Sequence, residues 1–139
     1  MPDNIRFSNP DAIAKPPGYS HVVEVIGPGR LIYFAGQLGM DRSGKMGANA
    51  REQMELAFQN LKAALASVDA GFEHLVKINN YIVDIGANIA QFREVRDKYV
   101  NTSAPPASTT IGVPELARPC ALFEIAAVSI LPARVAELR

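Results

Sequence analysis

A single apolar stretch decides the fold of this chain: Ala121-Leu122-Phe123-Glu124-Ile125-Ala126-Ala127-Val128-Ser129-Ile130-Leu131. Its residues are apolar on both pleat faces, which is typical of a strand that is covered on both sides. Glu124 interrupts this pattern, and an unpaired carboxylate is costly to remove from water. The residue therefore has either a Lys or Arg partner at an edge or interface, or a chemical role as a general acid/base or as the group that orients an attacking water.

The region before this stretch predicts another strand and, earlier, two amphipathic helices. Residues 107–113 are rich in β-branched side chains, and a Pro-bearing turn at residues 114–119 joins them to the last strand. Asn49 with Glu52, and Asn88 with Gln91, have the form of capping boxes, and Gly71 suits the end of the first helix. Apolar residues then recur at helical spacing at Met54, Ala57, Phe58, Leu61, Ala64, Leu65 and Val68, and again at Ile89, Phe92, Val95, Tyr99 and Val100.

The polar face of the second helix is interpreted as a mixed solvated surface rather than a binding patch. It contains both signs of charge, at Arg93, Glu94, Arg96, Asp97 and Lys98.

The remaining strands complete an α+β pattern. Strands are predicted around residues 5–7 and 75–84, and residues 22–26 and 31–35 are predicted to form a hairpin across Gly27-Pro28-Gly29. The order is β-β-β-α-β-α-β-β, with one mixed sheet and both helices on one of its faces. Because the other face also carries apolar residues, we expect it to be buried in a symmetric oligomer.

Length and composition exclude several classes of protein. The 139 residues suit a single domain over residues 1–139, and 14 Lys and Arg against 14 Asp and Glu argue against nucleic-acid binding. One cysteine and two histidines give no zinc cluster, and Cys120 is expected to be a small core residue. Neither a secretory signal nor an apolar run of membrane-spanning length is apparent, so a cytoplasmic location is expected.

Several linked motifs resemble those of the RidA/YjgF family of enamine/imine deaminases over nearly the whole chain. They are Gly18-Tyr19-Ser20, Phe34-Ala35-Gly36-Gln37-Leu38-Gly39, Gln53, Asn60-Leu61, Lys77, residues 81–84, Pro106-Ala107 and Phe123-Glu124-Ile125. The resemblance implies a chorismate-mutase-like subunit and a homotrimer with small-molecule clefts between neighbouring subunits. It also implies hydrolysis of a reactive imine or enamine to a carbonyl compound and ammonia without a cofactor, with Glu124 directing the water and Tyr19 lining the cleft.

The sequence departs from the family at the position that recognises the substrate carboxylate. Members that act on amino-acid-derived imines have an arginine directly after Pro-Ala, whereas this chain has Ser108. Loss of a charge-assisted hydrogen bond weakens recognition by roughly 1.5 to 3 kcal/mol. Gly18 also replaces a frequent proline, and His21 a common glutamine. Two substitutes are open: Arg118 reaches the cleft, or the hydroxyls of Ser108, Thr109 and Thr110 bind a neutral or differently shaped substrate.

Two functions from different classes therefore follow. The first is a deaminase whose substrate is not one of the simplest amino-acid-derived imines, for example an aminomuconate-type compound. The second is a non-catalytic trimer that binds a small molecule in the same cleft and has a regulatory role. A ribonuclease or translation-inhibitor function, sometimes attributed to the family, fits poorly with the neutral net charge.

Overall fold

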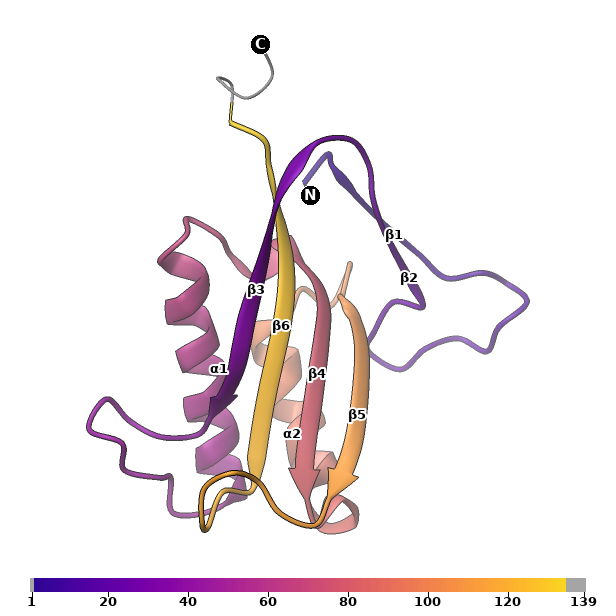
Figure 1. Cartoon of the computed structure of the whole chain (residues 1–139). Helices are drawn as coiled ribbons and strands as arrows, with labels where there is room; N and C mark the ends of the chain where they lie inside the picture. Colours follow the sequence, from indigo (N-terminus) through magenta and orange to yellow (C-terminus); the bar gives the residue numbers. More distant parts are fainter. Residues whose placement is uncertain (1, 135–139) are drawn as a thin grey trace.

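The computed structural model describes residues 2–134. Figure 1 shows strands in front of two helices, in the predicted β-β-β-α-β-α-β-β order. The elements are β1 (Ile5–Ser8), β2 (Val22–Val25), β3 (Gly29–Leu38), α1 (Ala50–Ala66), the short 3-10 helix η1 (Phe72–His74), β4 (Leu75–Val83), α2 (Ile85–Tyr99), β5 (Ala107–Val113) and β6 (Phe123–Pro132).

The main sheet has four strands in the order β3-β6-β4-β5. The quoted apolar stretch forms β6, which lies in the interior of the sheet and runs antiparallel to both β3 and β4. β4 and β5 run parallel, as the α2 crossover between them requires. Both helices cover the same face of this sheet (Figure 1), which confirms the predicted mixed sheet with two helices on one side.

The hairpin predicted between residues 22–26 and 31–35 is wrong. β2 pairs with β1 in a separate two-stranded ribbon, whereas β3 pairs with β6. Gly27 turns the chain with φ +79°, and the ribbon continues only as far as the hydrogen bond from Ile26 N to Asn4 O at 2.7 Å. β3 is ten residues long and finds a partner of equal length in β6, a longer ladder than the four-residue β2 offers.

The core lies between the helices and the covered face of the sheet. Phe58 of α1 is fully buried, and its ring centroid is 6.0 Å from that of Phe123 and 5.1 Å from that of Tyr99. Both predicted apolar stripes supply this core, which confirms the two amphipathic helices.

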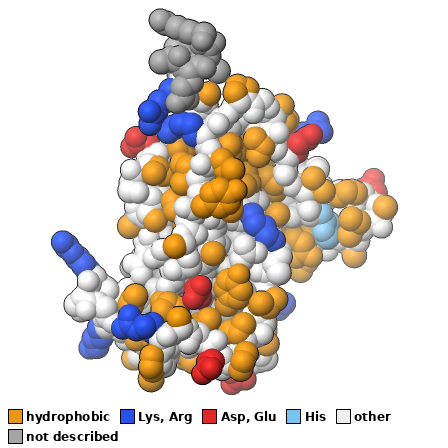
Figure 2. All heavy atoms as spheres, viewed as in Figure 1, with side chains coloured by type: hydrophobic (Ala, Val, Ile, Leu, Met, Phe, Trp, Pro, Cys, Tyr) orange, Lys and Arg blue, Asp and Glu red, His pale blue; other side chains and the backbone are white. Residues whose placement is uncertain are grey.

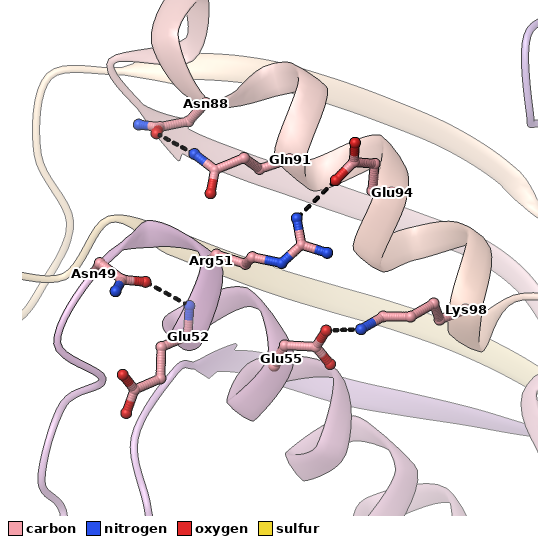
Figure 3. A network of polar contacts seen from close by, with 8 residues as sticks. All are labelled: Asn49, Arg51, Glu52, Glu55, Asn88, Gln91, Glu94 and Lys98. Carbon is pink, nitrogen blue, oxygen red and sulfur yellow. Dashed lines mark hydrogen bonds and ion pairs between the residues drawn. The ribbon is translucent and has the colours of Figure 1, made fainter.

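At the solvent edge, Arg51 pairs with Glu94 and Glu55 pairs with Lys98 across the two helices (Figure 3). Such exposed pairs typically contribute less than about 1 kcal/mol each.

The helix ends confirm one of the three predicted caps. The Oδ1 atom of Asn49 accepts a hydrogen bond from the Glu52 N–H at 2.9 Å, as predicted. Helix α1 ends earlier than expected, because Asp69 at φ +60° takes the left-handed position after the helix and Gly71 instead precedes η1. Helix α2 begins at Ile85, so Asn88 lies within its first turn, and its side-chain amide donates to the Val83 carbonyl at 2.9 Å.

Candidate functional site

A pocket of about 260 Å³ lies between α2, β5 and the loop that precedes β2. Its walls contain three of the four predicted substrate-binding residues, Tyr19, Ser108 and Thr110. The complete lining is Pro17, Tyr19, Ile89, Phe92, Arg93, Arg96, Ser108 and Thr110. Residues about 90 positions apart in the sequence therefore meet in one small cavity.

Ser20 fixes the loop that carries Tyr19. Its hydroxyl donates to the Pro105 carbonyl at 2.5 Å, and its backbone N–H donates to the Pro106 carbonyl at 3.2 Å. Ser20 is itself buried, so water does not compete effectively for these bonds. They attach the loop to the chain directly before β5, which places Tyr19 beside Ser108.

Asn80 of β4 organises the two hydroxyls in the pocket. Its Nδ2 atom lies 3.0 Å from the Ser108 Oγ atom, 3.1 Å from the Thr110 Oγ1 atom and 3.2 Å from the Thr109 carbonyl oxygen. The carbonyl can only accept, so this contact fixes the orientation of the amide. The amide has two N–H groups for these three oxygens, so the second is donated to one hydroxyl oxygen or shared between the two, and a hydroxyl that accepts keeps its own proton free to donate.

Arg96 corrects the interpretation of the α2 polar face as solvated. It is only 7% exposed, and its guanidinium carbon lies 5.7 Å from the centroid of the Phe92 ring. Its Nε atom donates to Asp97 Oδ1 at 2.9 Å. The sequence contained a signal for this burial that was missed: Ile89, Phe92, Arg96 and Tyr99 recur at steps of three, four and three, which puts Arg96 among the apolar residues of the helix.

Gly18 provides the space that the Arg96 guanidinium occupies. A Cβ atom on residue 18 would lie 2.2 Å from Nη2 of Arg96, a distance that no side chain could tolerate without displacing the guanidinium. The backbone of Gly18 also has φ +93°, in the region that favours glycine. The glycine that replaces a frequent proline of the family is thus in direct contact with an arginine in the wall of the pocket.

Glu124 lies on the other face of the sheet. Its neighbours Phe123 and Ile125 are buried against the helices, so alternation along β6 turns Glu124 away from them. Glu124 is half-buried between Leu38 of β3 and Tyr81 of β4, and within residues 2–134 its carboxylate has no hydrogen bond or ion pair. The alternative of a Lys or Arg partner is therefore not realised within the described chain.

Gly36 lies directly against the Glu124 carboxylate. A Cβ atom on residue 36 would be 2.1 Å from Oε2 of Glu124. The pairing between β3 and β6 shifts register between Phe34 and Gln37, so Gly36 lies in an irregularity that brings the backbone close to the acid. Gly36 therefore allows the backbone of β3 to lie close to the Glu124 carboxylate.

The sheet face that carries Glu124 is largely apolar and open. Its exposed residues include Tyr33 at 74%, Leu31 at 54% and Ile111 at 45%. Figure 2 shows hydrophobic side chains gathered on the sheet face turned to the viewer, above all over β3 and β6. Exposed apolar residues gathered on one face in this way are typical of an interaction surface.

Arg118 lies away from the Tyr19 pocket. It is in the loop between β5 and β6 and lines a separate pocket of about 570 Å³ together with Val83 and Cys120. Its Nη1 atom is 4.0 Å from the Met40 sulfur.

The assignment of Cys120 to the core is wrong. The residue is exposed, and its backbone has φ +66°.

Two further properties concern the described residues as a whole. Between residues 2 and 134, no three His, Cys, Asp or Glu side chains are grouped so that they could hold a metal ion. None of the helices in that range has the length and apolar character needed to cross a membrane.

A family model described as Endoribonuclease L-PSP matches residues 9–131. A RutC family protein of Aquifex aeolicus is 34% identical over 100 residues, which cover 70% of this chain and 77% of that protein. A 2-iminobutanoate/2-iminopropanoate deaminase of Dermatophagoides farinae is 34% identical over 102 residues, 70% of this chain and 74% of the relative.

The fold has counterparts among solved structures. YyfB of Yersinia pestis, described as a protein of unknown function of the conserved Rid protein family, superposes with a TM-score of 0.79 at 29% identity. The match covers 92% of this chain and 99% of that one. A YjgF family member of Neisseria meningitidis has a TM-score of 0.66 at 25% identity and covers 94% of this chain and 97% of its own.

Proposed function

The chain belongs to the Rid (YjgF) family, and from this premise we propose that it hydrolyses an enamine or imine to a carbonyl compound and ammonia. The observation that carries the proposal is the Glu124 carboxylate, which projects without a partner among residues 2–134 from the interior of an apolar sheet face. Desolvating a carboxylate there is costly, and a role in chemistry accounts for its retention. A relative at 34% identity that is named an imine deaminase supports this reaction class.

The reaction needs one positioned carboxylate. Glu124 takes a proton from a water molecule as the water oxygen attacks the C=N carbon, and it passes a proton to the nitrogen. The resulting carbinolamine collapses: Glu124 takes its O–H proton and transfers it to the amino nitrogen, a C=O bond forms as the C–N bond breaks, and ammonia departs. An enamine first tautomerises to the imine, its carbon gaining a proton while its nitrogen loses one. Water is the only co-reactant, so the reaction itself calls for no cofactor.

The assembly that we propose is a homotrimer closed through the open sheet face. The Tyr19 pocket is on the helix side of the sheet and Glu124 is on the other, so the two do not share one cavity within a chain. Packing the apolar face around Tyr33 against a neighbouring copy would bury it and would bring Glu124 of one subunit to the pocket of the next. The substrate would then bind in clefts between subunits.

The substrate that we propose is not one of the simplest amino-acid-derived imines. Ser108 lies in the pocket where an arginine would extend from β5, so the pocket lacks a guanidinium at that position. A longer compound, for example one of the aminomuconate type, would place its reacting carbon farther from its charged end.

The deciding experiment measures ammonia and carbonyl product from purified protein. 2-Aminoacrylate and its four-carbon homologue are generated in situ by a dehydratase, and an aminomuconate-type compound is supplied in parallel. Turnover of the larger compound alone supports the specialised deaminase, and turnover of the simple imines supports the reaction class but not the specialisation. No acceleration of any of them over the protein-free control contradicts the proposed function.

A second candidate is a non-catalytic trimer that binds a small molecule with a regulatory effect. The separation of the pocket from Glu124 within one chain favours it, because the pocket is complete without the acid. Saturable binding of a small molecule that the protein does not convert would support this candidate over the deaminase.

A further inference from the structure

We propose that Arg96 is the residue that binds the anionic group of the substrate, and that its guanidinium enters the pocket from helix α2, whereas the family arginine would enter from a different wall, β5. The proposal rests on the proposed function for the identity of the substrate, but the binding of an anion can be measured without turnover. The proposed specificity-determining residue, Arg96, is on helix α2, whereas Ser108, at the position of the family arginine, is on β5.

The hydrogen-bonding state of Arg96 is the first argument. Its side chain is 8% exposed, yet among residues 2–134 its only hydrogen-bond partner is Asp97, through Nε. The terminal nitrogens Nη1 and Nη2 donate to none of these residues. The side-chain atoms that are fully buried without a partner among residues 2–134 belong to Asn4, Asn80 and Ser129 and not to Arg96, so Nη1 and Nη2 remain accessible to water or to a ligand. Arg96 therefore presents two amino groups in the wall of a pocket, which is the fork that a carboxylate accepts.

The other walls of the pocket complement an anion. Ser108 and Thr110 bring two hydroxyls whose protons can donate to an anion, since it is the donor group of Asn80, Nδ2, that approaches each of their oxygens. Arg93 adds a second positive charge at the more exposed side of the pocket. These donors come from β5 and α2 and line the same cavity of about 260 Å³, a size suited to a small acid.

The position of Arg96 is held from three sides. Asp97 fixes Nε, the Phe92 ring lies against the guanidinium, and the backbone of Gly18 lies close to Nη2 on a third side. A preorganised guanidinium loses less conformational entropy on binding than a free surface arginine does. A purely structural arginine would instead direct its terminal nitrogens to backbone carbonyl oxygens.

The test compares an acid with its uncharged counterpart. 2-Oxobutanoate and methyl 2-oxobutanoate are titrated into the purified full-length protein, and dissociation constants are measured by calorimetry or by ligand-observed NMR. A guanidinium in the pocket is expected to favour the acid by about 10- to 150-fold, the range of a charge-assisted hydrogen bond. Equal affinity for the acid and the ester in the wild-type protein would overturn the proposal without any variant.

Variants assign the preference to Arg96. Arg96→Gln is expected to remove the preference for the acid, and Arg96→Lys to retain part of it because the charge stays but the fork is lost. Arg51→Gln is the matched control, since it deletes the same charge on α1, where Arg51 pairs with Glu94 outside the pocket. The double variant Arg96→Gln/Ser108→Arg is expected to recover the preference, because a guanidinium again reaches the pocket, now from β5.

The outcomes separate this proposal from the proposed function. Retention of the acid preference in folded Arg96→Gln would overturn the assignment of Arg96 and leave the deaminase proposal intact. Loss of the preference in that variant, with no hydrolysis by the wild-type protein, would support the assignment and contradict the deaminase. Thermal unfolding of each variant shows that it is folded, and recovery in the double variant is a result that a merely structural role for Arg96 does not produce.

Discussion

The two faces of the main sheet hold the residues of the proposed chemistry in different environments. On the helix side, Arg96, Ser108 and Thr110 surround a finished pocket whose polar groups are held by neighbours such as Asn80. On the open side, Glu124 lies between Leu38 and Tyr81, which are themselves half-buried, and it has no polar partner among residues 2–134. We propose that the helix-side pocket binds a ligand without help from another subunit, whereas Glu124 needs a second subunit to shield it.

This difference shows that the Glu124 carboxylate alone does not make a site and that its surroundings also matter. A carboxylate in water is a weak base that competes with solvent, and it gains reactivity when an apolar surface excludes water around it. The apolar residues beside Glu124 are therefore as much a part of the proposed chemistry as the acid.

The largest effect is expected from Glu124→Gln. The amide keeps the shape of the side chain but cannot take a proton from water, so kcat for imine hydrolysis should fall by about 10²- to 10⁴-fold. Binding of 2-oxobutanoate in the helix-side pocket should change little. Glu115→Gln, in the exposed loop between β5 and β6, is the control. Full activity of Glu124→Gln would show that the acid has no part in the reaction.

Charges introduced on the open face are expected to dismantle the assembly. Leu31→Glu with Tyr33→Glu places two carboxylates on the most exposed apolar positions of β3. Burying them against a neighbouring subunit would cost several kcal/mol per charge on the order given for buried ions, so light scattering should report a monomer with greatly reduced hydrolysis. Gln59→Glu on the exposed side of α1 should leave the mass unchanged. A double variant that remains fully assembled would exclude this face as the interface.

A smaller loss is expected from Gly36→Ala. The added methyl group would lie 2.1 Å from Oε2 of Glu124, so the carboxylate must move while the fold is retained. Displacement of a catalytic group by about 1 Å can reduce the rate by about 10²-fold, so we expect kcat to fall by up to that amount with KM little changed. Gly86→Ala on α2 is the control, because no atom lies within 4 Å of its added Cβ. Steady-state kinetics in which the two variants behave alike would refute the close-approach role of Gly36.

The smallest effect is expected on the helix side, from Gly18→Ala. Its Cβ would displace the Arg96 guanidinium, and the backbone at φ +93° adds strain of about 1 to 2 kcal/mol. We expect affinity for 2-oxobutanoate to fall by about tenfold or more, the lower end of a charge-assisted hydrogen bond, together with a lower melting temperature. Gly44→Ala has a similar φ of +88° with open space around it, so it should lower stability without changing affinity.

Patterns repeated over many residues made most of the fold predictable from the sequence. The apolar stripes of α1 and α2 and the continuous apolar run of β6 each depend on several side chains, so no single exception obscured them. Strand partners were harder to predict, because β2 and β3 are adjacent in sequence but pair with β1 and β6. The pairing depends on the bend at Gly27, a local backbone event that periodicity does not encode.

The site was predictable only in part. Tyr19 and Ser108 were expected in one cleft from their positions in the family motifs, and Thr110 as a possible substitute for the missing arginine. All three line one pocket, but their roles stay predictions. Arg96 was assigned to a solvated face because it is flanked by charged residues, although its helical position is among Ile89, Phe92 and Tyr99. Charge type alone suggested solvent, whereas the helical spacing pointed to the apolar side of the helix; only the packing of the loop at Gly18 against Arg96 is a tertiary contact that helical spacing does not encode.

The most direct test of the account is complementation between two inactive variants. Glu124→Gln removes the acid on the open face, and Ser108→Phe fills the pocket on the helix side, so each homomeric protein should be inactive. In mixed assemblies formed from equal amounts, a site that takes one half from each of two subunits is intact in about a quarter of cases. We predict that imine hydrolysis recovers to about that fraction of the wild-type rate. Mixed assemblies that remain inactive would contradict the account, because they would place both halves of the site in one subunit.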